Sequence, residues 1–277
     1  MKKRTISLLI AAAFILSLAA CSGAKKSGGE EAAQTEEAAV IAGSIPKALL
    51  SEEVKVETIQ LLKELPDSDI PYLLAAGELK IGVGNLSYML PASKASELTS
   101  TAQKARATGI YFADYNVLKA LGQPTTEIEA VLAKLTSDLN ITYVLNILQQ
   151  PAPEPSSKEA FAQYLNAQED QIIQELAADD KVDIQIELLS GLAAELAVVY
   201  ANPSLVIQGD LTTAGLTDNQ LKRLDILGQI IADLAVYYPD LEQVGEILSP
   251  LKDKLASVQT ARDANAEITA IRDALLK

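Results

Sequence analysis

The chain has 277 residues, with 23 Lys and Arg against 37 Asp and Glu, so its formal net charge at pH 7 is −14. A charge of this sign and size argues against nucleic acid as a partner, because nucleic-acid-binding surfaces are basic. The chain contains no histidine and a single cysteine. This excludes histidine metal ligands, histidine-dependent catalytic triads, internal disulfides and cysteine-cluster metal sites, and no residue pattern indicates a cofactor.

The first 20 residues have the pattern of a signal peptide. Residues 2–4 are basic (Lys-Lys-Arg), and residues 6–18 are apolar except for two serines. That apolar run is shorter than the roughly 20 residues that a membrane-spanning helix needs. Residues 1–20 are therefore predicted to be a secretory leader.

The leader ends in Leu18-Ala19-Ala20-Cys21, which resembles the lipobox of bacterial lipoproteins. The resemblance implies that Cys21 becomes the new N-terminus and carries a diacylglycerol thioether and an acylated amine, and such multiple acyl chains anchor a protein stably to a membrane. We therefore expect a lipid-anchored protein of the bacterial cell envelope. By the rule known for enterobacteria, the absence of Asp at Ser22 favours the outer membrane, on a side that the sequence leaves open. Ordinary secretory cleavage beside an incidental cysteine is the alternative.

Residues 21–40 are predicted to be a flexible tether that starts at the acylated Cys21. Gly, Ser, Ala, Lys and Glu dominate this stretch, and no large apolar residue precedes Val40. Such a composition cannot bury enough apolar surface to fold. Residues 41–277 then form the body.

The body is predicted to be all-α. From Ile41 onward apolar residues recur every three or four positions, the spacing typical of amphipathic helices, and breaks near residues 65–67, 121–124, 202–203 and 238–240 separate these stretches. We expect packed antiparallel helix pairs, a helical-repeat-like bundle with roughly nine or ten helices. Pro250 lies within an apolar stripe and should kink or split that helix.

A Pro-rich stretch at residues 151–155 divides the body near 151–157 into two parts that could be related halves. Residues 109–115 (Gly-Ile-Tyr-Phe-Ala-Asp-Tyr) are similar to residues 228–234 (Gly-Gln-Ile-Ile-Ala-Asp-Leu). Repeated helix pairs would produce this similarity, although Ala/Leu-rich helices also resemble one another by chance. We favour one continuous body over two separate halves.

Residues 109–115 also carry a resemblance to a family. Together with Gln123, Glu127 and Leu139-Asn140-Ile141, they resemble a motif of uncharacterised all-helical lipoproteins from Bacteroidetes. The resemblance extends over about residues 70–260 at the level of motifs, but residues 190–194 lack the aromatic character of that family. It implies an all-helical fold and an envelope location, and no activity.

Tyr111, Asp114 and Tyr115 are the candidate site of the body. Their spacing places them on one face of a helix, and Asp114 lies among apolar neighbours, where a carboxyl group needs polar partners or a raised pKa. One interpretation is a polar lining of a ligand groove between helices. The other is a structural carboxyl group bonded to a tyrosine hydroxyl or to the end of a neighbouring helix.

Two further patterns are weaker. Four acidic residues could offer oxygen ligands to a cation: Asp179, Asp180, Asp183 and Glu187. Their spacing does not match an EF-hand loop, and a helix boundary at Asp179-Asp180 is the simpler interpretation. A Gly-rich stretch at residues 82–85 lacks the Lys-Ser/Thr ending of a phosphate loop. The small residues there and just before it instead predict close helix packing or a kink: Ala75, Ala76, Gly77, Gly82 and Gly84.

The predicted function is that of an envelope lipoprotein with a non-catalytic helical body that binds a protein partner or is a structural component. It would contact the membrane through the lipid on Cys21. Binding of a small molecule or glycan in a groove near Tyr111, Asp114 and Tyr115 is the alternative. An enzyme would need two facing carboxyl groups in a cleft, and nothing selects such a pair from 37 acidic residues.

Overall fold

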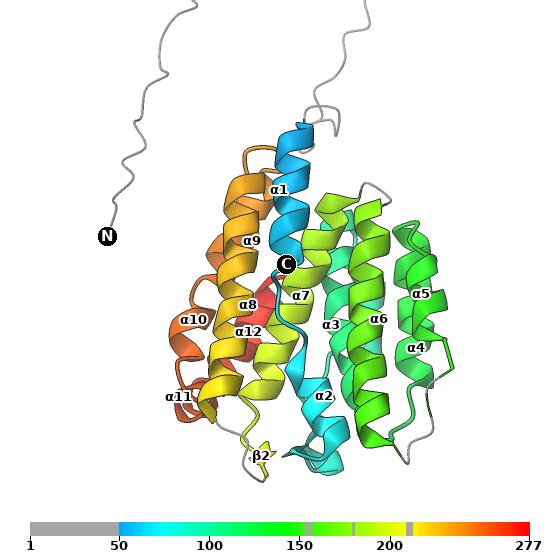
Figure 1. Cartoon of the computed structure of the whole chain (residues 1–277), viewed down its shortest axis with the longest axis vertical. Coiled ribbons are helices and arrows are strands. Elements are labelled where there is room, and N and C mark those ends of the chain that lie inside the picture. Colours follow the sequence, from blue (N-terminus) through cyan, green and yellow to red (C-terminus); the bar gives the residue numbers. More distant parts are fainter. Residues whose placement is uncertain (1–49, 152, 154–156, 179–180, 209–212) are drawn as a thin grey trace, which may run out of the picture. The chain divides into compact units, whose positions relative to one another are not determined.

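The computed structural model describes residues 50–277 except 152, 154–156, 179–180 and 209–212 (Figure 1). The predicted leader, the predicted tether and Cys21 lie outside these residues. Ile41–Lys277 form one compact unit, within which all the elements below lie.

The described part of the chain is all-α, which confirms the prediction. Its twelve α-helices include nine of seven or more residues. In chain order they are α1 (Glu52–Leu62), α2 (Asp69–Ala76), α3 (Thr101–Ala120), α4 (Thr126–Asp138), α5 (Tyr143–Leu148), α6 (Lys158–Ala178), α7 (Val182–Tyr200), α8 (Thr213–Leu234), α9 (Asp240–Leu248), α10 (Leu251–Lys254), α11 (Val258–Asp263) and α12 (Asn265–Ala274). The 3₁₀ helices η2 (Val83–Asn85) and η3 (Ala92–Ser96) precede α3, and the short strands β1 (Leu79–Lys80) and β2 (Val206–Ile207) pair antiparallel.

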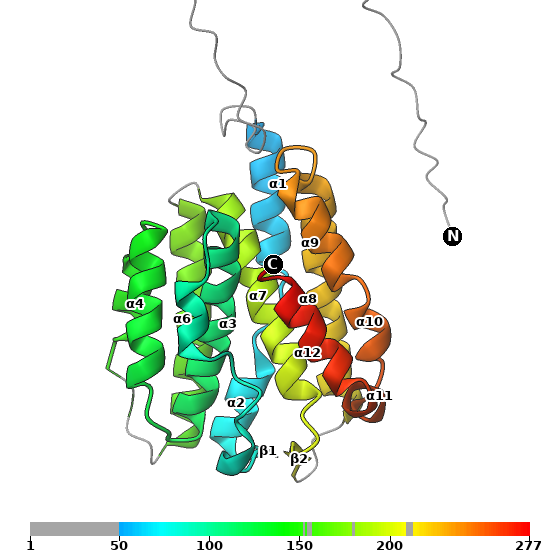
Figure 2. The same cartoon turned by 180° about the vertical axis from the view of Figure 1, so that it is seen from behind.

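Helix α7 is the centre of the unit. Every residue of α7 except Asp183 is buried, as expected for a largely apolar helix that other helices surround. It contacts α3, α6, α8, α9 and α12, and the view from behind shows α12 beside it (Figure 2). Its most extensive contact is with α3, in which every residue from Ala105 to Val117 is buried.

The contact between α3 and α7 depends on two glycines. A Cβ atom on Gly109 of α3 would lie 1.9 Å from the carbonyl oxygen of Leu188, and a Cβ on Gly191 of α7 would lie 1.9 Å from that of Arg106. Each helix therefore touches the backbone of the other directly. No larger residue fits at either position without separating the two helices.

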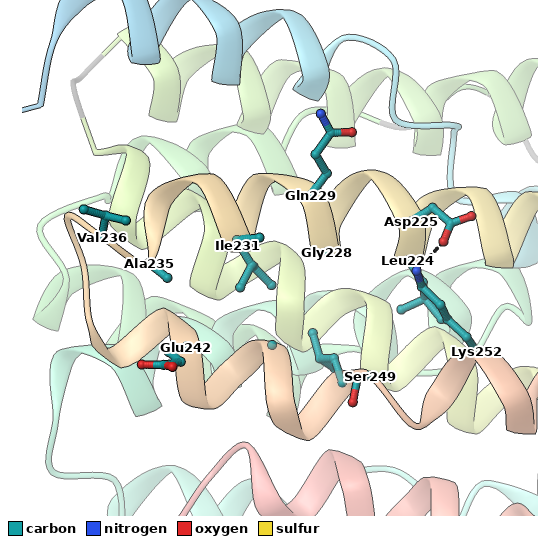
Figure 3. Close-up of a pocket in the computed structure, with 13 residues that line it drawn as sticks. Leu224, Asp225, Gly228, Gln229, Ile231, Ala235, Val236, Glu242, Ser249 and Lys252 are labelled. Atoms are coloured by element: carbon teal, nitrogen blue, oxygen red, sulfur yellow. Dashed lines mark ion pairs between the residues drawn. The ribbon is translucent and has the colours of Figure 1, made fainter. Parts of the chain in front are cut away.

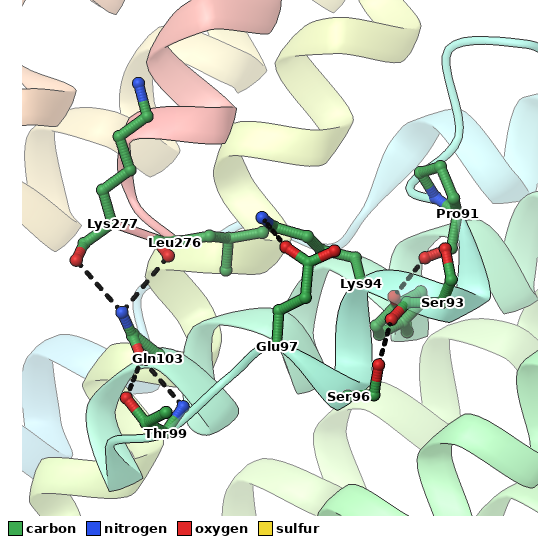
Figure 4. A network of polar contacts seen from close by, with 10 residues as sticks. Pro91, Ser93, Lys94, Ser96, Glu97, Thr99, Gln103, Leu276 and Lys277 are labelled. Carbon is green, nitrogen blue, oxygen red and sulfur yellow. Dashed lines mark hydrogen bonds and ion pairs between the residues drawn. The ribbon is translucent and has the colours of Figure 1, made fainter.

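Helix α3 also holds the C-terminal residues in place (Figure 4). At its start, Ser100 and Gln103 form a capping box, in which each side chain accepts a hydrogen bond from the other residue's backbone N–H. The Gln103 side-chain amide donates to the carbonyl oxygen of Lys277 (3.0 Å), and Arg106 Nη1 donates to that of Leu275 (2.9 Å). One turn of α3 thus binds the segment that follows α12.

Two local predictions can be compared with the structure. Pro250 splits its helix as predicted, because α9 ends at Leu248 and α10 begins at Leu251. Close helix packing is found at Ala75, which is buried with Ala162 and Leu165 of α6, but not at Gly77 and Gly84. Gly77 ends α2 in the left-handed conformation (φ 83°), and a Cβ on Gly84 would meet no atom within 4 Å.

Candidate functional site

Tyr111 and Asp114 contact the segment that leads into η3, and neither side chain is exposed. The Tyr111 hydroxyl donates to the Pro91 carbonyl oxygen at 2.7 Å, and the Leu90 N–H donates to Asp114 Oδ2 at 3.2 Å. Burial raises the pKa of Tyr111, so its hydroxyl keeps its proton and remains a donor. Two side chains of α3 therefore satisfy adjacent backbone groups of one loop.

Tyr115 belongs to a different cluster. Its hydroxyl donates to the Leu148 carbonyl oxygen at the end of α5 (2.8 Å) and accepts a hydrogen bond from Lys119 Nζ (2.8 Å). The same ammonium donates to the Tyr164 hydroxyl (3.0 Å) and lies 4.9 Å from the centroid of each tyrosine ring. Burial lowers the pKa of Lys119. The three residues predicted to act together thus point to two separate groups of partners.

Asp114 has a further partner that is distant in the sequence. Its carboxyl group shares a side-chain hydrogen bond with Glu195 of α7, and Glu195 is ion-paired with Arg272 of α12. Arg272 Nη2 also donates to the Tyr88 carbonyl oxygen at 3.1 Å. No N–H or hydroxyl donor of the described residues reaches Asp114 Oδ1 or Glu195 Oε1. A hydrogen bond between two carboxyl groups requires a proton on one of them.

That proton lies on Asp114. Burial, followed by the negative charge of Glu195, raises the pKa of Asp114 well above its usual value, against the Leu90 hydrogen bond and Arg272. Burial also raises the pKa of Glu195, but Arg272 opposes this shift. Neutral Asp114 therefore donates to the Glu195 carboxylate, whose charge Arg272 balances, so the buried cluster carries no net charge.

The cluster joins α3, α7, α12 and the loop before η3 by bonds within the protein. None of Tyr111, Asp114 and Tyr115 lines the pockets described below. Their polar atoms are used to hold neighbouring segments, which agrees with the structural interpretation. Their role in a ligand groove stays a prediction.

Two other buried ion pairs link helices. Arg106 of α3 donates from Nε and Nη2 to the two carboxylate oxygens of Glu187 on α7, at 2.5 and 3.3 Å. Arg223 of α8 donates from Nη1 to Glu169 Oε1 on α6 at 2.8 Å. With the pair formed by Arg272, each ion pair joins a glutamate of α6 or α7 to an arginine of a neighbouring helix.

One of these ion pairs involves Glu187, which belongs to the acidic residues that could offer oxygen ligands to a cation. Glu187 is bound by Arg106, and Asp179 and Asp180 lie outside the described residues, between the end of α6 at Ala178 and the start of α7 at Val182. Across the described ranges, no group of three or more Asp, Glu, His or Cys side chains is placed to hold a metal ion.

A groove of about 670 Å³ lies between α8 and α9 (Figure 3). The small residues Gly228, Ala232 and Ala235 of the α8 side and Gly245 of α9 line it. A Cβ atom on Gly228 would meet nothing within 4 Å, so the space above this glycine is open. Ile231 points from α8 towards α9 and forms part of the apolar lining (Figure 3).

The two ends of the groove differ in charge. At one end Lys252 is ion-paired with Asp225. At the other end lie Glu242 and Val236 (Figure 3). Val236 is 75% exposed. Val236 also borders a second pocket of about 240 Å³, which is lined by Val54, Glu57, Thr58, Asp233 and Tyr237.

No pattern in the sequence predicts this groove. The apolar stripe that predicts α8 runs along its buried face, through residues such as Leu224, Leu227 and Leu234. The groove instead uses small residues beside that stripe, among them Gly228 and Ala232. Small apolar residues on the exposed side of a helix are the sequence signal that would indicate this binding face.

No protein-family model, curated protein or solved structure matches this chain. Within the described ranges, no helix combines the length and the apolar character needed to cross a membrane. A function is therefore proposed from the residues of the chain alone.

Proposed function

We propose that this protein is a lipid-anchored component of the bacterial cell envelope whose helical body binds another protein, without catalysis, through the groove between α8 and α9. The leader and the Cys21 motif support the anchor and the location. The groove supports the binding role. The outer membrane is the proposed location, because Ser22 follows Cys21 where an inner-membrane lipoprotein of enterobacteria carries Asp.

The observation that carries the binding role is an apolar floor with charged residues at its rim. Exposed Gly228 and Ala232 form the floor beside the buried Ile231, and Asp225, Lys252 and Glu242 surround it. Protein interfaces have this arrangement, with an apolar centre and a polar, solvent-accessible rim. Among the described residues the exposed large hydrophobic side chains are Val56, Val206 and Val236, and Val236, at the end of the groove, is the most exposed of the three. A hollow of similar volume, about 660 Å³, lies beside Val206, but it contains an arginine, Arg262, and no exposed acidic residue.

A small apolar molecule is the second candidate, because the groove volume lies within the range of small-molecule pockets, about 300–1,000 Å³. A glycan is less favoured than a protein. Sugar rings commonly stack on aromatic side chains, and none of the 13 residues that line the groove is aromatic.

The binding role is tested by filling the groove. Gly228→Leu places a side chain in open space within a helix, so the fold should be retained and the groove occupied. A photo-crosslinking residue at Ala232 should capture one protein in intact cells, and Gly228→Leu should abolish that crosslink. Gly84→Leu is the matched control, because Gly84 also faces open space and lies outside the groove. Equal capture by Gly228→Leu would contradict the proposal.

The anchor is tested by metabolic labelling with palmitate. The wild-type protein should incorporate the label and fractionate with membranes, whereas Cys21→Ala should do neither. Absence of label from the wild-type protein would refute lipidation at Cys21, and this result would leave the binding role of the groove untouched.

A further inference from the structure

The charges around the groove define its partner more closely. Among the described residues that line the groove and the pocket beside it, Lys252 is the only cation, and it is paired with Asp225. Three exposed acidic residues lie at the opposite end, around Val236. Glu242 of α9 lines the groove itself, Glu57 of α1 and Asp233 of α8 line the second pocket, which shares Val236 with the groove, and no ion pair joins these acids to a described cation.

The walls of the groove determine the conformation of an occupant. Both walls are helices, whose backbone N–H and C=O groups are bonded within the helix and cannot pair with a bound segment. An extended peptide on this floor would bury unpaired backbone groups, whereas a helix satisfies its own. From Leu224, where the lining of the groove begins, to the end of α8 at Leu234 the wall is about 15 Å long, which matches roughly three turns of helix.

The small residues of the floor fit the same occupant. Gly228 and Ala232 lie one helical turn apart, and both are exposed. Residues of this size let the backbone of a second helix approach closely, and the apolar side chains of that helix can fill the volume between α8 and α9. This arrangement is the helix-in-groove mode of recognition.

We infer that the groove binds an amphipathic helix of a partner protein, which places a small-residue and aliphatic face against Gly228 and Ala232 and basic residues beside Glu57, Asp233 and Glu242. This inference rests on the proposed protein-binding function. A second copy of the chain is a poorer occupant, because each copy carries a net charge of −14 and would present the same acidic end.

The test uses the full-length chain and three synthetic helical peptides of about 16 residues with one Ala/Leu face. Their first turn carries three Lys, three Gln or three Glu. At low salt the Lys peptide should bind about tenfold more tightly than the Glu peptide, and the difference should shrink at high salt. Gly228→Leu should weaken all three peptides, whereas Gly84→Leu should not.

Charge reversal locates the basic end. Replacing both Asp233 and Glu242 by Lys should reverse the order of the peptides. The control variant, Asp218→Lys with Asp253→Lys, makes the same change of charge at exposed positions outside the groove and should keep the order. If neither variant alters the order of the peptide affinities, or if both reverse it, the assignment of the basic end is overturned.

The remaining outcomes separate the inference from the proposed function. If the charge of the peptides has no effect but Gly228→Leu blocks all of them, the inference fails and the protein-binding groove stands. If Gly228→Leu weakens none of the peptides, or if no peptide binds, the inference fails and the crosslinking experiment decides the function. If the chain alone forms a dimer that Gly228→Leu dissociates, the occupant is a second copy and the inference is overturned.

Discussion

Asp114 is a carboxyl group whose surroundings select its neutral form. It is buried between the Leu90 N–H, which needs an acceptor, and the Glu195 carboxylate, which needs a donor. A protonated carboxyl group supplies both, as does the side-chain amide of asparagine. The folded protein therefore holds this proton to a higher pH than the unfolded chain, in which the Asp pKa is about 3.9.

The pH dependence of Asp114→Asn follows from this proton. Because the pKa of Asp114 is raised in the folded state, its contribution to stability is full below the unfolded pKa and is lost as the pH rises towards the folded pKa. Asn does not titrate, so the variant should gain stability relative to wild type as the pH rises from about 4 to 8. Urea unfolding at several pH values measures this difference.

Asp138→Asn is the matched control. The side-chain hydrogen bonds from Lys104 and Lys134 lower the pKa of this exposed carboxylate, so its contribution to stability is present above the unfolded pKa and lost at acid pH. This variant should therefore lose stability relative to wild type only as the pH rises through the acid range to about 4, and from there to pH 8 its difference from wild type should stay nearly constant. A stability difference between wild type and Asp114→Asn that does not change with pH would mean that Asp114 is ionised in the folded protein.

For single residues, the sequence predicted that Asp114 needs polar partners but did not identify those partners. An acidic residue among apolar neighbours in a helix indicates a buried carboxyl group with polar partners. The partners themselves, Glu195 and Arg272, belong to helices far along the chain, and no local pattern pairs them with Asp114. Likewise, Tyr111 and Tyr115 share a helix face in the sequence but reach different loops in the structure.

Between helices, the decisive feature is the direct contact of α3 and α7 at Gly109 and Gly191. Gly109 and Gly228 occupy equivalent places in the two similar segments of the sequence. Their surroundings are opposite, because a Cβ on Gly109 would collide with the backbone of α7 and a Cβ on Gly228 would meet nothing. A similar sequence therefore serves a helix crossing in one case and an open groove in the other.

Alanine at Gly109 and alanine at Gly228 should change the free energy of unfolding in opposite directions. Gly109→Ala must push α3 from α7 and is expected to lower the free energy of unfolding by about 3 kcal/mol or more. Gly228→Ala removes the flexibility of an exposed helical glycine and should raise it by up to about 1 kcal/mol. Chemical denaturation of both variants measures the two changes, and equal effects would contradict the described helix crossing.

The ion pair of Arg106 with Glu187 joins the same two helices. Arg106→Met would leave the Glu187 carboxylate buried without its cation, and we expect a loss of about 3–5 kcal/mol. Arg106→Met combined with Glu187→Leu removes both charges and should recover most of that loss. If the double variant were no more stable than the single one, the cost would come from packing or from the lost Leu275 contact instead of from the unpaired charge.

Over the whole unit, the sequence predicted the helices better than their arrangement. Amphipathic periodicity identifies helices such as α4 and α9, and Pro250 marks a true break. Periodicity does not indicate which helix is central, because α7 is largely apolar and has no exposed face to orient it. The α8–α9 groove was missed for a related reason, since it depends on residues that are small and not on residues that are apolar and large.

The stability of the whole unit should fall as the pH rises above about 4. Burial raises the pKa of several carboxyl groups, including Asp69, Glu187 and Glu195 in addition to Asp114. Each raised pKa means that the folded state binds more protons than the unfolded state in this range. Repulsion within a chain of net charge −14 adds to the trend. Thermal unfolding at pH 5 and pH 8 checks this fall in stability, and a higher unfolding midpoint at pH 8 would contradict it.

Helix α1 has a mechanical consequence for a protein held at Cys21, as proposed. Only Thr58 and Leu62 of α1 are buried, and its principal contact is with α8, whereas α3 and α7 are locked together over most of their length. A pulling force that arrives from the membrane enters the unit through α1, so α1 should peel away first while the central helices stay packed. Because α1 supplies Val54, Glu57 and Thr58 to the second pocket, this first yielding step would also remove one wall of that pocket, and with it the Glu57 carboxylate, before the central helices separate.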